Sequence, residues 1–283
     1  MIRPLRRSIY KSPAQLRLMI EPGLLTARAL AAACAAVRPG VTTAEIDSIA
    51  ENVIIAGGGT PNFKMERGYH HTLCVSVNDE VVHGIPGDRV IEAGDIVSID
   101  CGAEVGGWHG DSAATVVVPD AERPDIVDAR ERLSAATQGS MWAGIARLAS
   151  ATHLNEVGDG VQSYIEANTD AHGREYGIIE DYIGHGIGRS MHEDPPVFNY
   201  RVQMQGPAVK SGLVVAIEPM MVEGSPDTEV RDDEWTVATV DGGAAAHWEH
   251  SIAVHAGGIW VLTAEDGGAA GLASFGVTPT PVA

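Results

Sequence analysis

The chain has 283 residues, which allows one large α/β domain or two small ones, and a composition ordinary for a globular protein except for its many glycines. Its formal net charge of −19 at pH 7 argues against non-specific binding of nucleic acid or an anionic membrane by the body of the protein. The three cysteines are widely spaced, odd in number and set among apolar residues, which predicts buried free thiols in a reducing compartment rather than a disulfide framework.

The first segment, residues 1–11, is basic, with Arg3, Arg6, Arg7 and Lys11 close together. We expect a solvated, flexible arm, and the functional alternative is a weak contact with RNA or another acidic surface, such as that of the ribosome. Residues 12–17 are too polar for the core of a signal peptide, and no apolar run reaches the length of a membrane span. The sequence therefore predicts a cytoplasmic protein that contacts neither DNA nor a membrane.

The helices and strands predicted after this arm occur in groups along the chain. A first helix is predicted over residues 12–37, weakened or kinked by Pro22-Gly23, and a second over 43–56 behind a capping-box pattern that starts at Thr42. The remaining predicted helices are 121–149 and 155–167, and the predicted strands are 72–85, 96–101, 113–118, 213–218, 235–240, 251–255 and 259–262, with 102–110 joining the second and third strands. We expect residues 12–263 to form one domain and the Gly-, Ala-, Thr- and Pro-rich residues 264–283 to form a flexible tail.

Two of these strands resemble each other. Residues 94–100 and 212–218 each begin with a glycine, continue as an apolar β-type run and end in a carboxylate, Asp100 or Glu218. A second carboxylate, Asp111 or Glu249, then stands before the next strand. The pattern predicts two similar halves that bring two carboxylates each to a shared centre, and the alternative is a chance likeness between short strands.

Five side chains with metal-ligand chemistry recur along the chain: Asp100, Asp111, His185, Glu218 and Glu249. Each alone has an ordinary explanation as a turn, strand-end or surface residue. Together, four carboxylates and an imidazole in apolar or glycine-rich segments are costly to bury without a cation. Oxygen ligands with one imidazole suit Mn²⁺, Fe²⁺, Co²⁺ or Zn²⁺, and four carboxylates exceed the needs of one ion. The sequence therefore predicts a site for two divalent metal ions that activates water.

Two further histidines could serve such a site. His83 lies at the edge between a strand and a turn, and His192 follows His185 by seven residues. Each is either an ordinary surface histidine or, near the metals, a hydrogen-bond donor to a polarised carbonyl or a leaving amine.

The motifs around these residues resemble the type I methionine aminopeptidases, whose α/β pita-bread fold is shared with creatinase and prolidase. They occur in the family's order over nearly the whole chain, from about residue 12 to residue 262, and their combination is highly specific. The matching segments are Cys74-Val75-Ser76-Val77-Asn78, His83-Gly84-Ile85-Pro86, Ile99-Asp100, His109-Gly110-Asp111, Gly184-His185-Gly186-Ile187-Gly188-Arg189, His192-Glu193-Asp194-Pro195, Ile217-Glu218-Pro219-Met220, Trp235-Thr236-Val237 and Trp248-Glu249-His250.

The resemblance implies two pseudo-symmetric halves around a central antiparallel sheet with a dimetal centre. Asp100 would chelate one ion, Asp111 and Glu249 would bridge both, and His185 and Glu218 would bind the other. A dimetal-bridging water or hydroxide would attack the first peptide bond of a nascent protein that begins with methionine and has a small second residue. Glu218 would help to move the proton of that water.

The resemblance also implies roles for the remaining site residues. His192 would hydrogen-bond the scissile carbonyl oxygen and the developing oxyanion, His83 would contact the substrate amide nitrogen, and Trp235 would line the methionine pocket. The family usually has a cysteine and two aromatic residues in this pocket, and the corresponding positions here hold Phe63, Glu66 and Tyr69. Of these, Tyr69 alone keeps the pattern.

The departure at Glu66 and Phe63 leaves alternatives open. A carboxylate that faces an apolar thioether would weaken its binding unless the side chain turns to solvent. One alternative is therefore a dimetal aminopeptidase of altered amino-terminal specificity, and another is a non-catalytic peptide-binding relative, against which the five retained ligands argue. The expected partners are nascent amino termini, and the resemblance implies a monomer.

Overall fold

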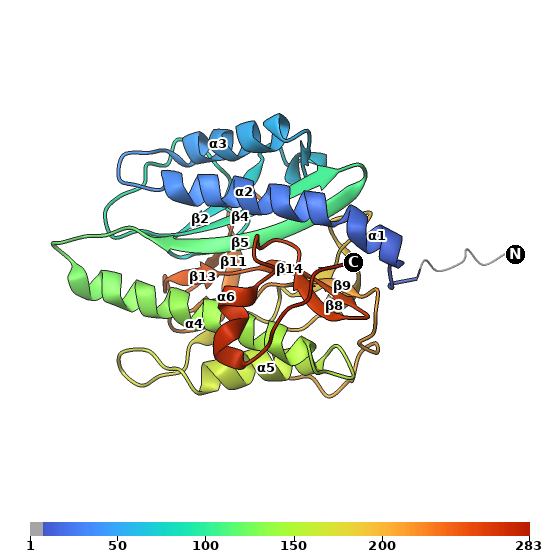
Figure 1. Cartoon of the computed structure of the whole chain (residues 1–283). Helices are drawn as coiled ribbons and strands as arrows, with labels where there is room; N and C mark the ends of the chain where they lie inside the picture. Colours follow the sequence, from blue (N-terminus) through green and yellow to red (C-terminus); the bar gives the residue numbers. More distant parts are fainter. Residues whose placement is uncertain (1–7) are drawn as a thin grey trace, which may run out of the picture.

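The computed structural model of the chain describes residues 8–283, so the first seven residues, with Arg3, Arg6 and Arg7, lie outside the described part. Its helices and 3-10 turns are α1 (Pro13–Leu18), α2 (Ile20–Ala36), α3 (Thr43–Ala56), η1 (Phe63–Met65), α4 (Pro124–Leu148), α5 (Glu156–Glu166), α6 (Ala269–Leu272) and η2 (Ala273–Phe275). Figure 1 shows α2 and α3 on one outer face, α4 and α5 on the opposite face, and the strands in between.

The strands form two main antiparallel sheets and two small ones. The first sheet pairs β4 (Ile96–Val105) with β1 (Thr60–Pro61), β2 (Leu73–Val77) and β5 (Trp108–Val117). The second has the order β15 (Gly258–Val261), β14 (His250–His255), β9 (Val214–Ile217), β7 (Gly184–Gly186) and β8 (Glu193–Val197). The small sheets are β13 (Ala245–His247), β10 (Met220–Val222) and β6 (Gly177–Ile178), and β11 (Thr228–Val230), β12 (Val237–Thr239) and β3 (Glu80–Val82).

The first helix predicted from the sequence is divided into α1 and α2 just before its proline. The break falls at Met19, because the ring of Pro22 would clash with the carbonyl of residue 18, four positions earlier. The glycine beside that proline brings α2 close to the second sheet, since a Cβ at Gly23 would lie 2.5 Å from the carbonyl oxygen of Leu262. The stretch Pro13–Ala36 has the length and mean hydropathy (1.3) of a membrane span, but α2 packs on β4 and β5, so a role in the core accounts for its composition.

The strands predicted over 96–101 and 113–118 are parts of one longer hairpin. The connection expected over 102–110 is wrong, because β4 and β5 continue through it to a two-residue turn at Gly106-Gly107. Both glycines have positive φ, 60° and 76°, as a tight hairpin turn requires. Asp111 therefore lies inside β5, directly opposite Gly102, and Asp100 lies opposite Ala113.

The two halves predicted from the sequence repeat lie on opposite sides of the molecule and meet at its centre. The β4–β5 pair packs with α2 and α3 around one core cluster, and the β9–β14 pair packs with α4 and α5 around another. The halves are joined by backbone hydrogen bonds between Ala113 and Glu249 in both directions, 3.3 Å and 3.0 Å. The hydroxyl of Ser251 adds a bond to the Asp111 carbonyl at 2.8 Å.

Two predictions about the ends of the chain differ from the structure. Tyr10 forms a β-bridge with Leu213, and Lys11 is buried, so the described part of the basic arm is fixed. The tail, residues 264–283, is also packed: Leu272 is fully buried, and the amide of Thr280 donates to the carbonyl of Ile259 at 2.9 Å. Its glycines serve close packing, since a Cβ at Gly271 would lie 2.2 Å from the ring of Trp142. Composition suggested flexibility because it does not reveal such contacts.

Candidate metal centre

The five predicted ligands come together between the two halves. Asp100 and Asp111 project from β4 and β5, His185 lies in β7, Glu218 follows β9 and Glu249 precedes β14. The ligand atoms of Asp111, His185 and Glu249 all lie within 4.8 Å of one another. The Nε2 atom of His185 is 3.3 Å from Oε1 of Glu218 and 3.9 Å from Oδ2 of Asp111. Residues more than 100 positions apart therefore share one small volume.

Several polar atoms of this cluster are buried without a partner. Oδ1 of Asp100, Oδ1 of Asp111 and Oε1 of Glu249 accept no hydrogen bond within the described chain. The side chains themselves are almost inaccessible, with Glu249 1% exposed and Asp111 3% exposed. A buried carboxylate oxygen without a donor is strongly unfavourable, so the cluster needs a cation that the protein itself does not supply.

The pKa shifts of the five residues also favour a bound cation. Burial raises the pKa of Asp100 to about 7, and burial together with repulsion from the neighbouring carboxylates raises the pKa of Asp111 and Glu249 well above the usual range. Burial, followed by repulsion from Asp100, does the same to Glu218. Burial and the nearby His192 lower the pKa of His185 to about 4, which keeps its imidazole neutral, the form that binds metals. The donors therefore fit one or more divalent cations.

A cavity of about 350 Å³ opens onto these ligands. Every site residue predicted from the sequence lines it. Its walls comprise Phe63, Glu66, Tyr69, Val82, His83, Asp100, Asp111, Asp181, Tyr182, Ile183, His185, Met191, His192, Glu218, Met220, Trp235 and Glu249. The metal-ligand cluster thus faces a cavity within the range of volumes, about 300–1,000 Å³, that is typical of small-ligand sites.

The two predicted catalytic histidines lie on the cavity wall. The ring of His192 is 4.4 Å from that of His185, measured between centroids. His83 has a positive φ of 61° just after β3. The centroid of its ring lies 5.8 Å from that of Tyr182 and 6.4 Å from that of Trp235. Burial and the proximity of His192 lower the pKa of His83 to about 4. Burial likewise lowers the pKa of His192, against an opposing influence from Glu66.

Aromatic side chains form the apolar part of the cavity. The ring of Tyr69 lies 5.0 Å from that of Trp235 and 6.1 Å from that of Phe63, both edge to face. The hydroxyl of Tyr69 donates to the carbonyl of Leu73 at 2.7 Å, which fixes the ring. Glu66 lines the same cavity but is an exposed residue, so its charge has access to water. The carboxylate therefore does not have to be desolvated against a bound apolar side chain.

The sequence interpretation did not single out several other residues beside the site, among them Tyr182, Met191 and His247. Tyr182 and Met191 line the cavity. Met191 directly precedes His192, and Tyr182 lies two residues before Gly184, so closeness to a recognised motif was the available signal. His247 is fully buried in β13, and its Nε2 lies 3.7 Å from Oε2 of Glu218 and has no hydrogen-bond partner within the described residues. Burial lowers its pKa to about 3, so it is neutral. Its place two residues before Glu249 was visible, but its proximity to Glu218 depends on the pairing of β13 with β10.

Comparison with known proteins agrees with this arrangement over most of the chain. The profile of metallopeptidase family M24 matches residues 17–256. Methionine aminopeptidase 1 of Mycobacterium tuberculosis is 45% identical over 254 residues, which cover 89% of this chain and 94% of the relative. Methionine aminopeptidase 1 of Bacillus subtilis is 40% identical over 255 residues, covering 90% and 98%.

The fold has solved counterparts as well. The crystal structure of a methionine aminopeptidase from Thermotoga maritima superposes with a TM-score of 0.82 at 34% identity, covering 94% of this chain and all of that one. The likeness confirms the pita-bread fold that the sequence motifs implied. The chain belongs to metallopeptidase family M24.

Proposed function

We propose that this protein is a metal-dependent methionine aminopeptidase that removes the initiator methionine from nascent proteins with a small second residue. The observation that supports this most directly is the buried cluster of four carboxylates and one neutral imidazole at the base of the aromatic cavity. The relatives described above carry the same activity in their names. We further propose a cytoplasmic location, action on chains emerging from the ribosome and a monomeric state.

The ligand set divides naturally between two divalent ions. Asp100 would hold one ion, Asp111 and Glu249 would hold both, and His185 and Glu218 would hold the other. Such ions lower the pKa of a bound water and polarise a carbonyl, which makes hydrolysis feasible at neutral pH. The set does not choose among Mn²⁺, Fe²⁺, Co²⁺ and Zn²⁺, because the same donors suit all four.

The remaining residues of the cavity bind and orient the substrate. We propose that Phe63, Tyr69 and Trp235 surround the methionine side chain, since their rings form a continuous apolar wall. His192 would donate a hydrogen bond to the scissile carbonyl oxygen, and His83 would contact the amide nitrogen. Glu218 would accept the proton from the attacking water, since its carboxylate lines the cavity beside the other proposed ligands.

A comparison of substrates tests this function. Chelator-stripped enzyme should release no amino acid from Met-Ala-Ser, and added Mn²⁺ or Co²⁺ should restore release of methionine with little release from Leu-Ala-Ser or from Glu- and Lys-led tripeptides. Metal-dependent release that favours another residue would keep the hydrolytic chemistry and overturn the substrate. A folded protein without turnover under any metal would instead support the binding-only alternative.

Replacement of Glu66 distinguishes methionine specificity from an altered specificity. We expect Glu66→Gln to change kcat/KM for Met-Ala-Ser by less than about threefold, because an exposed side chain usually alters free energies by under about 0.5 kcal/mol. Trp235→Ala, the matched change on the apolar wall, should lower kcat/KM at least about tenfold, since a lost apolar group in a pocket is worth about 1–3 kcal/mol. If Glu66→Gln instead abolished the cleavage of Lys-led peptides and improved that of Met-Ala-Ser, the altered-specificity alternative would be correct.

A further inference from the structure

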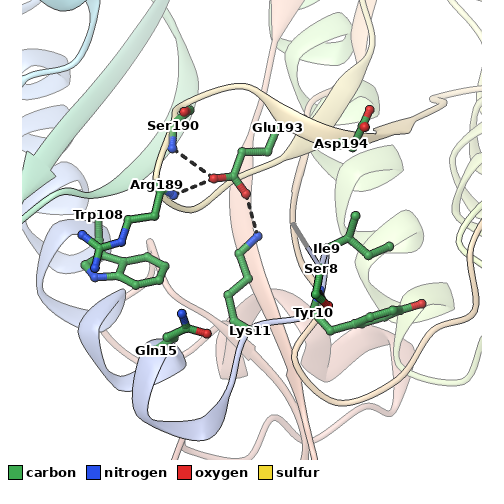
Figure 2. A pocket seen from close by; sticks show the side chains of 10 residues that line it. All are labelled: Ser8, Ile9, Tyr10, Lys11, Gln15, Trp108, Arg189, Ser190, Glu193 and Asp194. Carbon is green, nitrogen blue, oxygen red and sulfur yellow. Dashed lines mark hydrogen bonds and ion pairs between the residues drawn. The ribbon is translucent and has the colours of Figure 1, made fainter. Parts of the chain in front are cut away.

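The loop between β7 and β8 has two functional sides. Met191 and His192 line the catalytic cavity, whereas Arg189, Ser190 and Glu193 line a second cavity of about 930 Å³ beside the amino-terminal segment (Figure 2). The loop is short, and both strands that it joins belong to the sheet that carries His185. A contact that holds the loop on the side of the second cavity therefore also limits the movement of His192.

A single carboxylate organises the outer side of this loop. Oε1 of Glu193 accepts the backbone amides of Arg189 at 2.7 Å and Ser190 at 3.1 Å, and Oε2 accepts the ammonium of Lys11 at 2.9 Å. Figure 2 shows these three bonds converging on Glu193. The side chain of Lys11 is 6% exposed and that of Glu193 is 26% exposed, so this ion pair is partly shielded from solvent.

The amino-terminal segment is held firmly enough to act as an anchor. The amide of Lys11 donates to the carbonyl of Gly212 at 2.6 Å, and the hydroxyl of Tyr10 donates to that of Ala208 at 2.8 Å. Space for the lysine depends on two glycines: a Cβ at Gly188 would lie 2.6 Å from Cε of Lys11, and one at Gly212 would lie 2.3 Å from its carbonyl oxygen. The surrounding chain is therefore shaped around this side chain.

A second contact ties the same loop to the metal-ligand hairpin. The guanidinium of Arg189 lies over the ring of Trp108, 4.2 Å from the centroid, and donates to the carbonyl of Gly107 at 3.1 Å. Both residues belong to the β4–β5 hairpin, which carries two of the carboxylate ligands. With Arg189 holding one end of the loop, the Lys11–Glu193 pair holds the other, and His192 lies between them.

From this geometry we infer that Lys11 is a positioning residue, which holds the His192 loop through Glu193. The inference rests on the proposed function for its catalytic consequence. Removal of the ammonium would leave a partly buried carboxylate without its cation, and such a change costs more than the loss of an exposed pair. The loop would relax toward solvent to rehydrate Glu193, and His192 would lose its alignment with the substrate carbonyl.

Replacement of Lys11 by methionine tests the inference, because methionine keeps most of the apolar stem. We expect kcat for Met-Ala-Ser to fall about tenfold to a hundredfold, as for a catalytic group misplaced by about 1 Å, with a smaller change in KM. Lys11→Arg should restore most of kcat. The control is Lys210→Met. The ammonium of Lys210 lies 4.1 Å from the ring centroid of Tyr10, the residue next to Lys11, and Lys210 is not among the partners of Glu193. An unchanged kcat in Lys11→Met would overturn the inference.

A measurement that does not depend on activity accompanies the kinetics. The amides of Arg189 and Ser190 should exchange hydrogen faster in Lys11→Met than in the wild type and Lys210→Met, while amides of the core strand β4 keep their protection. If Lys11→Met does not fold, Glu193→Gln weakens the same pair from the other side and should show the same pattern. If hydrogen exchange at both amides is unaltered, the Lys11–Glu193 pair does not hold the loop, even if activity falls.

A double-mutant cycle separates positioning from general stability. In the His192→Ala background, Lys11→Met should have less than about a twofold further effect on kcat, because the residue acts through a side chain that is already absent. Fully additive losses would overturn the inference and indicate a merely structural lysine. A wild-type enzyme that released no methionine would overturn the proposed function and the catalytic part of the inference. The exchange measurement would still show whether Lys11 holds the loop through Glu193.

Discussion

Replacement of Asp111 by alanine is expected to lower kcat for methionine release by at least about 10³-fold while leaving the protein folded. A loss of this size corresponds to about 4 kcal/mol of transition-state stabilisation, which is the scale of metal-ion assistance to a hydrolysis. Asp111 is one of three residues whose ligand atoms all lie within 4.8 Å of one another, and it is proposed to hold both ions. Its removal would therefore affect both proposed ions rather than one.

The folded state should tolerate this change because one oxygen of the side chain is buried without a donor within the described residues. Oδ1 of Asp111 is buried without a donor, and the carboxylate repels its neighbours in the metal-free protein. The backbone of the residue stays fixed by Ser251, whose hydroxyl accepts from its amide at 3.1 Å and donates to its carbonyl at 2.8 Å. Circular dichroism and thermal unfolding of the chelator-stripped variant would check that the fold is retained.

Asp47→Ala provides the matched control, since Asp47 is another buried aspartate. Its Oδ1 accepts the amides of Thr72 and Leu73 at 2.8 Å and 2.7 Å, so its loss leaves two donors unpaired. We expect the free energy of unfolding to fall by about 1–3 kcal/mol while the folded fraction keeps its kcat. Equal loss of activity in the two variants, or an Asp111→Ala protein that retains full turnover, would contradict the assigned role of Asp111.

In the metal-free protein, the buried carboxyl of Asp100 is expected to contribute stability that is lost as the pH rises from about 4 to 7, while the buried His83 and His185, with pKa values of about 4, contribute in the opposite direction. The pKa of Asp100 is about 7 in the folded chain, against 3.8 for an ordinary aspartate, so between these values the folded state keeps a proton that the unfolded state has released. Unfolding then releases that proton, and this contribution to the free energy of unfolding decreases with pH across this window. The difference between the two pKa values of Asp100 corresponds to a change on the order of 4 kcal/mol in the free energy of unfolding, because one pKa unit is worth about 1.4 kcal/mol.

Bound metals should reverse this dependence. Divalent ions require ionised carboxylates, so they bind more tightly as the pH rises and stabilise the very form that burial disfavours. The gain in Tm on addition of Mn²⁺ to stripped protein should therefore be larger at about pH 7.5 than at about pH 5. Differential scanning calorimetry at the two pH values, with and without Mn²⁺, measures it.

Asp100→Asn serves as the control for this experiment. The amide cannot titrate, so the stripped variant should lack the loss of stability between about pH 4 and 7 that Asp100 contributes to the stripped wild type. Stripped wild type and stripped Asp100→Asn with the same pH dependence of stability, or a gain in Tm that does not depend on pH, would argue against a buried carboxylate cluster that binds cations.

Local patterns determined much of the secondary structure. The capping box at Thr42 and Glu45 forms as predicted, with both reciprocal hydrogen bonds present, because such a motif depends only on residues within one helical turn. The helix break near Pro22 and the two apolar β-type runs that lead to Asp100 and Glu218 are likewise set by neighbours in the sequence. The β4–β5 connection was missed because the glycines at 102 and 110 read as a loop, whereas they pack closely inside a hairpin.

The sequence by itself determined the chemistry: five donors of the right types, the two histidines and the motifs that identify the family. Only the tertiary structure decided which of these groups touch, because contacts such as His185 with Glu218 and Ala113 with Glu249 join distant parts of the chain. It also decided that Glu66 is exposed, that the tail is packed and that Lys11 reaches Glu193 across 182 positions. Burial and pairing depend on how sheets and helices enclose a residue, and a linear pattern carries that information only where the enclosing neighbours are local.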